Sequence, residues 1–423
     1  MTPYRLLGWL WPRQQSVLLC SLVALLITAA AADESGQKSE TAGTNNAKFQ
    51  YATAQNNALT RSGFEHYYDL DYDSAIRDFE HVLAEQPGDP FAVNHLTAAL
   101  LFRELYHAGA LETGLYTGNN FVNEHAPIKL DARLEARIKE LMAKAVELAN
   151  KRIARNPNDA QAYYARGVAH GLEATYTAVV RKAWFAALGS AKAARRDHEK
   201  ALELEPSYSD ARLVVGMQSY IVGSLPWAIR VLAHAVGESG SKEQGMKDIE
   251  AAENGGGEAS IDAKVVLGLF LRREQRYKEA LDNERSLTAA HAHNFLFALE
   301  EANILKDWGK GPEAVAAYRA IISRAKAGEY YGPQLEFADY GLGEALRGQN
   351  DFAKAAEAYD DAAKLPDSSP DIRLRAALWA GEMYDLLEKR DLAIQRYQNV
   401  IAQNADSEQA EVARRNLKEP YRN

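Results

Sequence analysis

Apolar residues recur every three to four positions along most of this chain, and this spacing predicts amphipathic helices. The stretch from Leu59 to Pro87 shows the pattern as two short helical segments, with Tyr72 at the turn between them. Pro87 ends the second segment, because proline disfavours helix in the residue that precedes it. No region shows the period-two alternation expected of strands. The pattern therefore predicts an all-α protein built of helix pairs.

Small and aromatic residues mark each predicted pair in the same order. In the first pair, Gly63 leaves room for the partner helix, Ala75 permits close packing, and Phe79 fills the space one turn later. Similar markers recur at Gly167 with Ala201, Gly216, Gly268 with Ala280, Ala302 with Ala314 and Tyr318, Gly343 with Tyr359, and Gly381 with Tyr397. This order resembles the tetratricopeptide repeat, whose period is about 34 residues.

The resemblance implies a right-handed superhelical solenoid of about eight tetratricopeptide-like helix pairs. A polar C-terminal helix, from Ser407 to Lys418, is expected to cap the last pair. The pairs are irregular over residues 49–260, with long insertions, and regular over residues 261–423.

The irregular part holds several expected departures from the repeat. One pair has its first helix near 91–106 and its second helix over about 131–155. Tyr163–Leu188 is expected as one first helix of unusual length, and Trp227 is expected to begin a second helix. A short helix, Lys242–Glu253, then interrupts the array between Gly-rich turns. The Gly-Ser-Lys-Glu-Gln-Gly element that begins it is faintly similar to outer-membrane-associated eukaryotic tetratricopeptide proteins.

The N-terminal residues have the pattern of a secretory signal peptide. Arg5 and Arg13 are the only charged residues before an apolar run over residues 17–27, which ends in small residues. That run is shorter than the roughly 20 residues that span a bilayer, and the A-x-A site favours a removable signal over an anchor. We expect cleavage after Ala32 and a flexible leader over residues 33–48. The protein is then an exported bacterial one, periplasmic or secreted.

Composition narrows the expected function. The chain has 49 basic and 58 acidic residues and a formal net charge of −9, without the basic excess typical of nucleic-acid binding. Its single cysteine, Cys20, lies inside the predicted signal, so the mature chain has no disulfide or thiolate site. The ten histidines show no metal-ligand spacing, and no nucleophile elbow or phosphate loop is present. We therefore expect no enzyme activity, no metal, no cofactor and no transmembrane helix in the mature chain.

Two segments are candidates for a specific role. The segment from Leu105 to Asp131 is rich in Gly and Asn, and it is either a binding loop or a passive excursion. The aromatic residues of Tyr163–Leu188 either bind a partner or belong to the core.

The resemblance also implies that the first helices of successive pairs line a concave groove for peptides or protein helices. Aromatic and arginine anchors commonly dominate such binding. The residues expected in the groove or its covering loop are Phe64, Tyr67, Tyr68, Tyr116, Phe121, Tyr164, Met217, Tyr220, Arg272, Arg273 and Arg347. The alternative is that several of these aromatics pack between helices.

Three function classes follow from these features. The leading one is an exported scaffold or adaptor that binds a protein or peptide partner in the cell envelope through the groove. The second is a small-ligand or glycan-binding protein that uses an aromatic N-terminal pocket. The third is a non-catalytic accessory subunit of an envelope enzyme complex.

Overall fold

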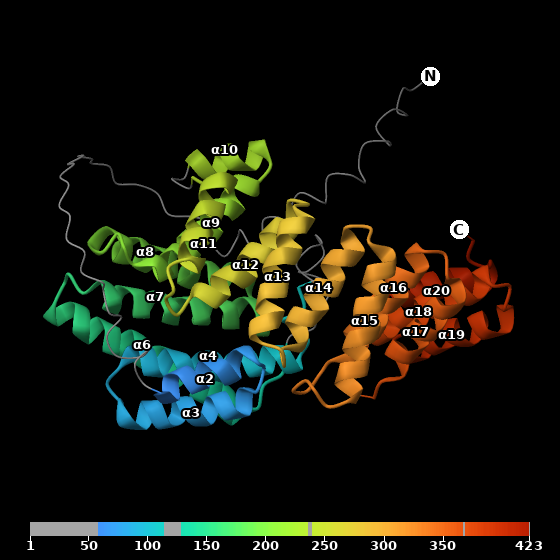
Figure 1. Ribbon diagram of the computed structural model, residues 1–423, viewed down its shortest axis with the longest axis horizontal. Coiled ribbons are helices and arrows are strands. Elements are labelled where there is room, and N and C mark those ends of the chain that lie inside the picture. Colours follow the sequence, from blue (N-terminus) through green and yellow to red (C-terminus); the bar gives the residue numbers. More distant parts are fainter. Residues whose placement is uncertain (1–57, 114–127, 236–238, 367–368, 423) are drawn as a thin grey trace, which may run out of the picture. The chain divides into compact units, whose positions relative to one another are not determined.

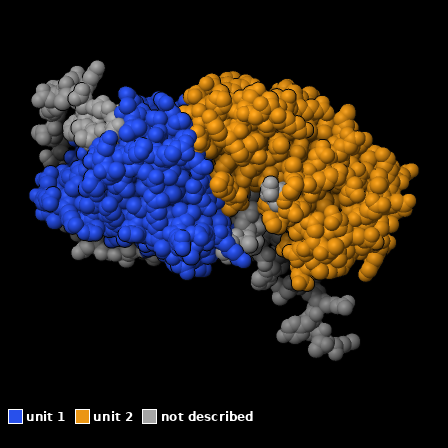
Figure 2. Space-filling view, turned by 90° about the horizontal axis from the view of Figure 1, so that it is seen from below, with its two compact units in different colours: residues 1–67, 72–105, 115–267 blue, residues 68–71, 106–114, 268–423 orange. Residues whose placement is uncertain are grey.

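The computed structural model describes residues 58–113, 128–235, 239–366 and 369–422, and all regular elements in these ranges are helical (Figure 1). The chain divides into two compact units (Figure 2). Unit 1 comprises Met1–Tyr67, Tyr72–Leu105 and Leu115–Leu267, and unit 2 comprises Tyr68–Asp71, Tyr106–Gly114 and Gly268–Asn423.

The helices of unit 1 follow one another in pairs. They are α2 (Ala58–Tyr68), α3 (Tyr72–Glu85), α4 (Pro90–His107), α6 (Ala132–Arg155), α7 (Ala160–Thr175), the π-helix η2 (Tyr176–Val180), α8 (Trp184–Leu204), the 3₁₀ turn η3 (Ser209–Ala211), α9 (Arg212–Ser224), α10 (Trp227–Ala235) and α11 (Lys242–Glu253). The boundary between the units falls inside α12 (Ser260–Arg273).

The helices of unit 2 also follow one another in pairs. Its helices are α13 (Tyr277–Ala290), α14 (Phe295–Asp307), α15 (Gly311–Lys326), α16 (Leu335–Gly348), α17 (Phe352–Lys364), α18 (Pro370–Leu386), α19 (Arg390–Gln403) and α20 (Glu408–Lys418). Two segments from early in the chain complete this unit. The Asn294 side chain donates to the Tyr68 carbonyl oxygen at 2.6 Å, and the Tyr106 hydroxyl donates to the Gly332 carbonyl oxygen at 3.0 Å.

The predicted fold class is confirmed. In the described residues the helices form the successive pairs α2/α3, α4/α6, α7/α8, α9/α11, α12/α13, α14/α15, α16/α17 and α18/α19, and α20 follows as the cap. The expected helices near 91–106 and 131–155 are α4 and α6. The Asp131 side chain caps α6 by accepting from the backbone N–H groups of Arg133 and Leu134.

The marker residues pack as their order predicts. A Cβ atom built on Gly63 would lie 2.5 Å from the Phe79 ring, and one on Gly381 would lie 2.6 Å from the Tyr397 ring. Real Cβ atoms do not approach so closely, so each glycine is required for the aromatic ring of the second helix to rest on the first. This contact sets the spacing within a pair and explains why Gly and an aromatic residue recur together.

The prediction of one long helix over Tyr163–Leu188 is wrong. The α-helix ends at Thr175, one π-helical turn follows to Val180, and α8 begins only at Trp184. Lys182, in the break, has a left-handed backbone with φ of 52°. Residues other than glycine rarely adopt this backbone conformation, and a helix cannot continue through it. The chain therefore turns here and starts the second helix of the pair.

The expected partner of α9 is also different. Trp227 does begin a helix, α10, but the helix packed along α9 is α11, which the sequence suggested to be an interruption. Glycines explain the pairing, because Cβ atoms built on Gly216 and Gly245 would lie 2.8 Å and 2.4 Å from the backbone of the facing helix. The two backbones therefore touch, and α10 is left outside the pair.

Candidate functional site

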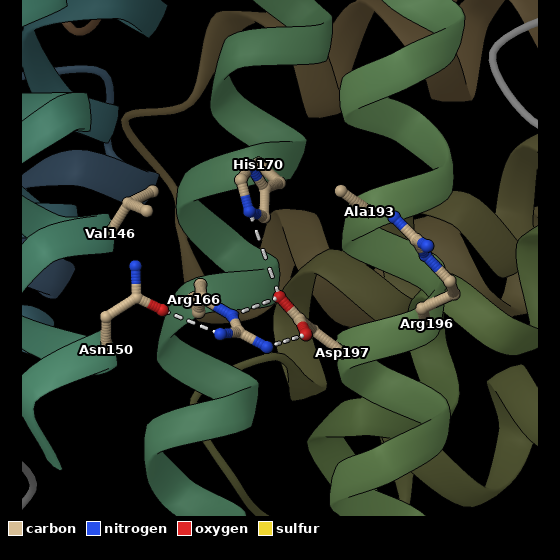
Figure 3. Close-up of a pocket in the computed structure, with 7 residues that line it drawn as sticks. All are labelled: Val146, Asn150, Arg166, His170, Ala193, Arg196 and Asp197. Carbon is tan, nitrogen blue, oxygen red and sulfur yellow. Dashed lines mark hydrogen bonds and ion pairs between the residues drawn. The ribbon is translucent and has the colours of Figure 1, made fainter. Parts of the chain in front are cut away.

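A pocket of about 540 Å³ lies in unit 1, between the second helix of one pair and both helices of the next (Figure 3). Helices α6, α7 and α8 contribute its walls. The lining residues are Val146, Asn150, Arg166, His170, Ala193, Arg196 and Asp197. They come from positions three or four apart on each helix, which bring side chains to one face.

An ion pair forms one wall of this pocket. Arg166 donates from Nε and Nη2 to the two carboxylate oxygens of Asp197, at 2.8 Å and 2.6 Å, and from Nη1 to the Asn150 amide oxygen at 2.6 Å (Figure 3). The hydrogen bonds with Asp197 raise the pKa of Arg166 above its ordinary value. The carboxylate is almost buried and its charge is matched, so this pair fixes α7 against α8.

The remaining polar groups of the pocket are less constrained. His170 Nε2 lies 3.9 Å from Asp197 and Nδ1 lies 3.6 Å from Glu173, both beyond hydrogen-bond distance. Arg196 is exposed and makes no ion pair with any described residue. With Asp197 already matched by Arg166, the charge left in the pocket is that of Arg196. The arrangement suits one negative group, and it contains no serine, threonine, cysteine or lysine that could act as a nucleophile.

A second candidate site lies in unit 2, on the first helices of its last two pairs. Arg347 of α16 stacks on the Trp379 ring of α18, with the guanidinium carbon 4.1 Å from the ring centroid. Arg375 of α18 lies over the Tyr340 ring of α16 at 5.3 Å. We call these four residues the arginine–aromatic row. All four are partly exposed, so the row reaches the surface while its rings hold the guanidinium groups in place.

Glu344 fixes the middle of this row. Arg347 donates from Nη2 to its carboxylate at 2.9 Å, and the Tyr359 hydroxyl donates to the other carboxylate oxygen. The side chain of Arg347 remains 34% exposed. Its position is therefore set before any partner binds, which lowers the entropy lost on binding.

Several residues expected at the groove lie in the interior instead. Tyr68, Tyr164 and Tyr220 are 6%, 6% and 1% exposed. Tyr164 packs edge-on against Tyr208 and His198, with ring centroids 4.9 Å and 5.2 Å apart. For these three tyrosines the surface expectation is wrong and the alternative, packing between helices, holds. Burial of a large aromatic ring removes much apolar area from water, which favours packing in the core.

Arg272 is also buried, at 4% exposure, and the expectation that it meets a partner is wrong. Its Nη1 donates to Glu300 at 2.7 Å and its Nη2 lies 2.6 Å from Asp307. These contacts join α12 to α14 inside unit 2. The sequence gives no sign of the pairing, because the partners lie 28 and 35 residues away.

The other expected residues are partly exposed or undescribed. Phe64 and Tyr67 are partly buried, with Phe64 edge-on to Phe79 and Tyr67 edge-on to Tyr72. Met217, Arg273 and Arg347 are also partly buried, and Arg347 belongs to the row described above. Tyr116 and Phe121, in the long insertion, lie outside the described residues.

The sequence did not reveal the pocket, nor Arg375 and Trp379 of the row. Arg166 and Asp197 are 31 residues apart, and only the packing of α7 on α8 brings them together. Within the described ranges, no group of three or more His, Cys, Asp or Glu residues could hold a metal ion. Nor is any described helix both long and apolar enough to cross a membrane.

Comparison with known proteins gives one family match. The family model for "Regulator of microtubule dynamics protein 1-3" matches residues 126–294, from just before α6 to the residue before α14. This part of the chain, which includes the pocket, is similar to that family. No curated protein sequence matches the chain.

Solved structures of low sequence identity also match. Cut9–Hcn1 of the APC/C hetero-tetramer is 15% identical with a TM-score of 0.47, and the match covers 85% of this chain and 54% of that one. This chain thus spans about half of that relative's length. Yeast Tom70 is 12% identical with a TM-score of 0.40, covering 85% and 87% of the two chains. Human IFIT1 is 12% identical with a TM-score of 0.41, covering 88% and 82%.

Proposed function

We propose that this protein is an exported, non-catalytic scaffold or adaptor that binds a protein or peptide segment in a bacterial cell envelope. The observation that supports this function is the arginine–aromatic row on α16 and α18. Arginine and aromatic side chains that are held in place yet reach the surface are the typical anchors of protein interfaces.

The row also indicates the chemistry of the partner. The guanidinium faces of Arg347 and Arg375 rest on the Trp379 and Tyr340 rings. Each guanidinium group is also paired within its own helix, Arg347 with Glu344 at 2.9 Å and Arg375 with Asp371 at 3.3 Å. A guanidinium edge pairs with a carboxylate through two parallel hydrogen bonds. We propose that an acidic residue or a chain terminus of the partner segment meets the row in addition to these pairs within the helices.

Replacement of an anchor tests this function. The chain from residue 33 is used to capture partners from an envelope fraction of the source cells, and the captured protein is then titrated. Arg347→Ala and Trp379→Ala should each weaken its binding about tenfold or more. The matched control is Arg319→Ala, since Arg319 is exposed on α15, the second helix of the preceding pair. Equal binding by all three variants would exclude the row as the binding site.

Export is tested independently. The proposal rests on the basic residues, apolar run and A-x-A site at the N-terminus. The protein recovered from cells should begin at Asp33, as determined by intact mass, and should fractionate with the envelope. A chain that retains residues 1–32, or that stays in the cytoplasm, contradicts export whatever the row binds.

The pocket of unit 1 favours a second candidate function, the binding of a small ligand. Its lining includes Arg196, which has no charged partner among the described residues, so we infer that the ligand is a small monocarboxylate. A dianion would keep one charge unmatched, because Asp197 is already paired with Arg166 and Arg196 supplies the one remaining charge of the lining. Titration calorimetry with small monocarboxylates, compared between the wild type and Arg196→Ala, tests this function. Binding that survives the substitution removes the pocket from consideration.

A further inference from the structure

Helix α10 carries an exposed stripe of two apolar and two basic side chains. Trp227, Arg230, Val231 and His234 occupy positions i, i+3, i+4 and i+7, which lie on one helical face. Trp227 is 75% exposed and Val231 is 59% exposed, and Arg230 and His234 are exposed as well. Two large apolar side chains next to each other and rimmed by basic groups form an exposed patch, and such patches mark interaction sites.

The position of α10 in unit 1 leaves this stripe facing outward. Figure 1 shows α10 at the top of the view, next to α9 and away from the other pairs of the unit. It contacts α9, and Arg230 Nη1 donates to the Gly223 carbonyl oxygen at the end of that helix at 3.2 Å. Because α11 has taken the place beside α9, α10 contributes little to the repeat array itself. Its exposed side chains therefore need another explanation.

We propose that the α10 stripe docks unit 1 on an anionic lipid surface. A helix with tryptophan and aliphatic side chains among basic ones, and without acidic residues, is suited to the headgroup region of a bilayer. The nine residues of α10 contain no Asp or Glu. Tryptophan prefers this interface, and an arginine close to it is attracted by anionic headgroups.

The net charge of the chain also indicates which part of the protein contacts the lipid surface. The whole chain has a formal net charge of −9, so an anionic surface repels it in general. Attachment must then come from a local patch where apolar and basic groups coincide, and α10 is such a patch.

Two protein occupants fit the stripe less well. Two large apolar side chains provide far less than the roughly 800 Å² per partner of a stable protein interface. A second copy packed by two-fold symmetry on this short helix would bring Arg230 and His234 close to their own counterparts. A lipid surface has neither difficulty, because it needs no complementary shape and supplies negative charge everywhere.

The experiment measures vesicle binding by flotation. The chain from residue 33, which contains every described residue, is mixed with vesicles of phosphatidylglycerol and phosphatidylcholine or of phosphatidylcholine alone. We expect it to float with the anionic vesicles and to dissociate as salt is raised. Trp227→Ala should weaken binding about tenfold or more, because a large apolar side chain no longer leaves water. Arg230→Gln should weaken it about fivefold.

Trp308→Ala is the matched control. Trp308 is also exposed, at 37%, and lies beside a cation, with Lys310 Nζ 5.1 Å from its ring, but it follows the end of α14 and is not part of such a stripe. This variant should float like the wild type. All substituted side chains are exposed, and an unchanged helical circular dichroism spectrum verifies the fold.

Three results of the flotation experiment would overturn the proposal. They are a wild type that does not float with anionic vesicles, a Trp227→Ala variant that floats as well as the wild type, and equal losses for Trp227→Ala and Trp308→Ala. A fourth is self-association of the wild type that Trp227→Ala abolishes without changing flotation, since the stripe would then meet a second copy.

Discussion

Two glycines one turn apart in α7 should respond to alanine in opposite directions. A Cβ atom on Gly171 meets nothing within 4 Å, whereas one on Gly167 would lie 2.5 Å from His198 Nδ1 and 3.2 Å from the Ala194 carbonyl oxygen. His198 is fully buried and donates from that nitrogen to Ala194 at 2.7 Å. The added methyl group must therefore displace both the ring and its hydrogen bond.

The magnitudes follow from these contacts. Gly171→Ala should raise the free energy of unfolding by about 0.5–1 kcal/mol, because alanine loses less backbone entropy in a helix. The same gain applies to Gly167→Ala, but overpacking costs about 1–3 kcal/mol and a buried hydrogen bond left unmade costs about 1–3 kcal/mol. The net effect is a destabilisation of about 1–5 kcal/mol.

Native-state hydrogen exchange of the α7 amides is the suitable assay, since it reports local stability where two units need not unfold together. The double variant Gly167→Ala/His198→Ala isolates the contact. In the His198→Ala background, the penalty at Gly167 should shrink by about 1–3 kcal/mol. Equal signs at the two glycines, or an unchanged penalty in the double variant, would refute this account of helix pairing.

Two further predictions concern unit 2. Arg272→Ala should lower the free energy of unfolding by about 3–5 kcal/mol, because Glu300 and Asp307 lose their buried partner. In urea unfolding, the double variant Arg272→Met/Glu300→Leu should recover part of the lost stability. Equal losses in the single and double variants would contradict this. Burial raises the pKa of Glu382 from 4.5 to about 7, even though Asn416 donates to it, so the folded state binds a proton that the unfolded chain lacks between these values. Stability should therefore fall as pH rises from 4.5 to 7, and Glu382→Gln should flatten this part of a Tm profile; a profile of unchanged slope would speak against it.

The repeat architecture was accessible from the sequence because it depends on local volume. Gly63 and Phe79 belong to the two helices of one pair, which are neighbours in the chain. Their contact follows from helix geometry and side-chain size alone. Gly381 and Tyr397 repeat the same relation. A pattern that acts over so short a distance is visible wherever it recurs.

The site residues were harder to predict, for two physical reasons. A small rotation of a first helix about its own axis decides whether a tyrosine on it faces solvent or the next pair. Tyr164 and Tyr220 face inward. Partners such as Arg166 and Asp197 meet only after α7 has packed on α8. The pairing of α9 with α11 was likewise hidden, because it depends on backbone contact at Gly216 and Gly245 rather than on side-chain periodicity.

The early segments that complete unit 2 affect how the protein is made. In a simple solenoid each repeat touches only its neighbours and can fold as it leaves the ribosome. Here the Tyr68 carbonyl and the Tyr106 hydroxyl each find a partner 226 residues further along the chain. At ordinary translation rates that partner is synthesised roughly 10–45 s later. The first repeats are therefore synthesised long before these two hydrogen bonds can form, and unit 2 is completed only after the chain has been synthesised past Gly332.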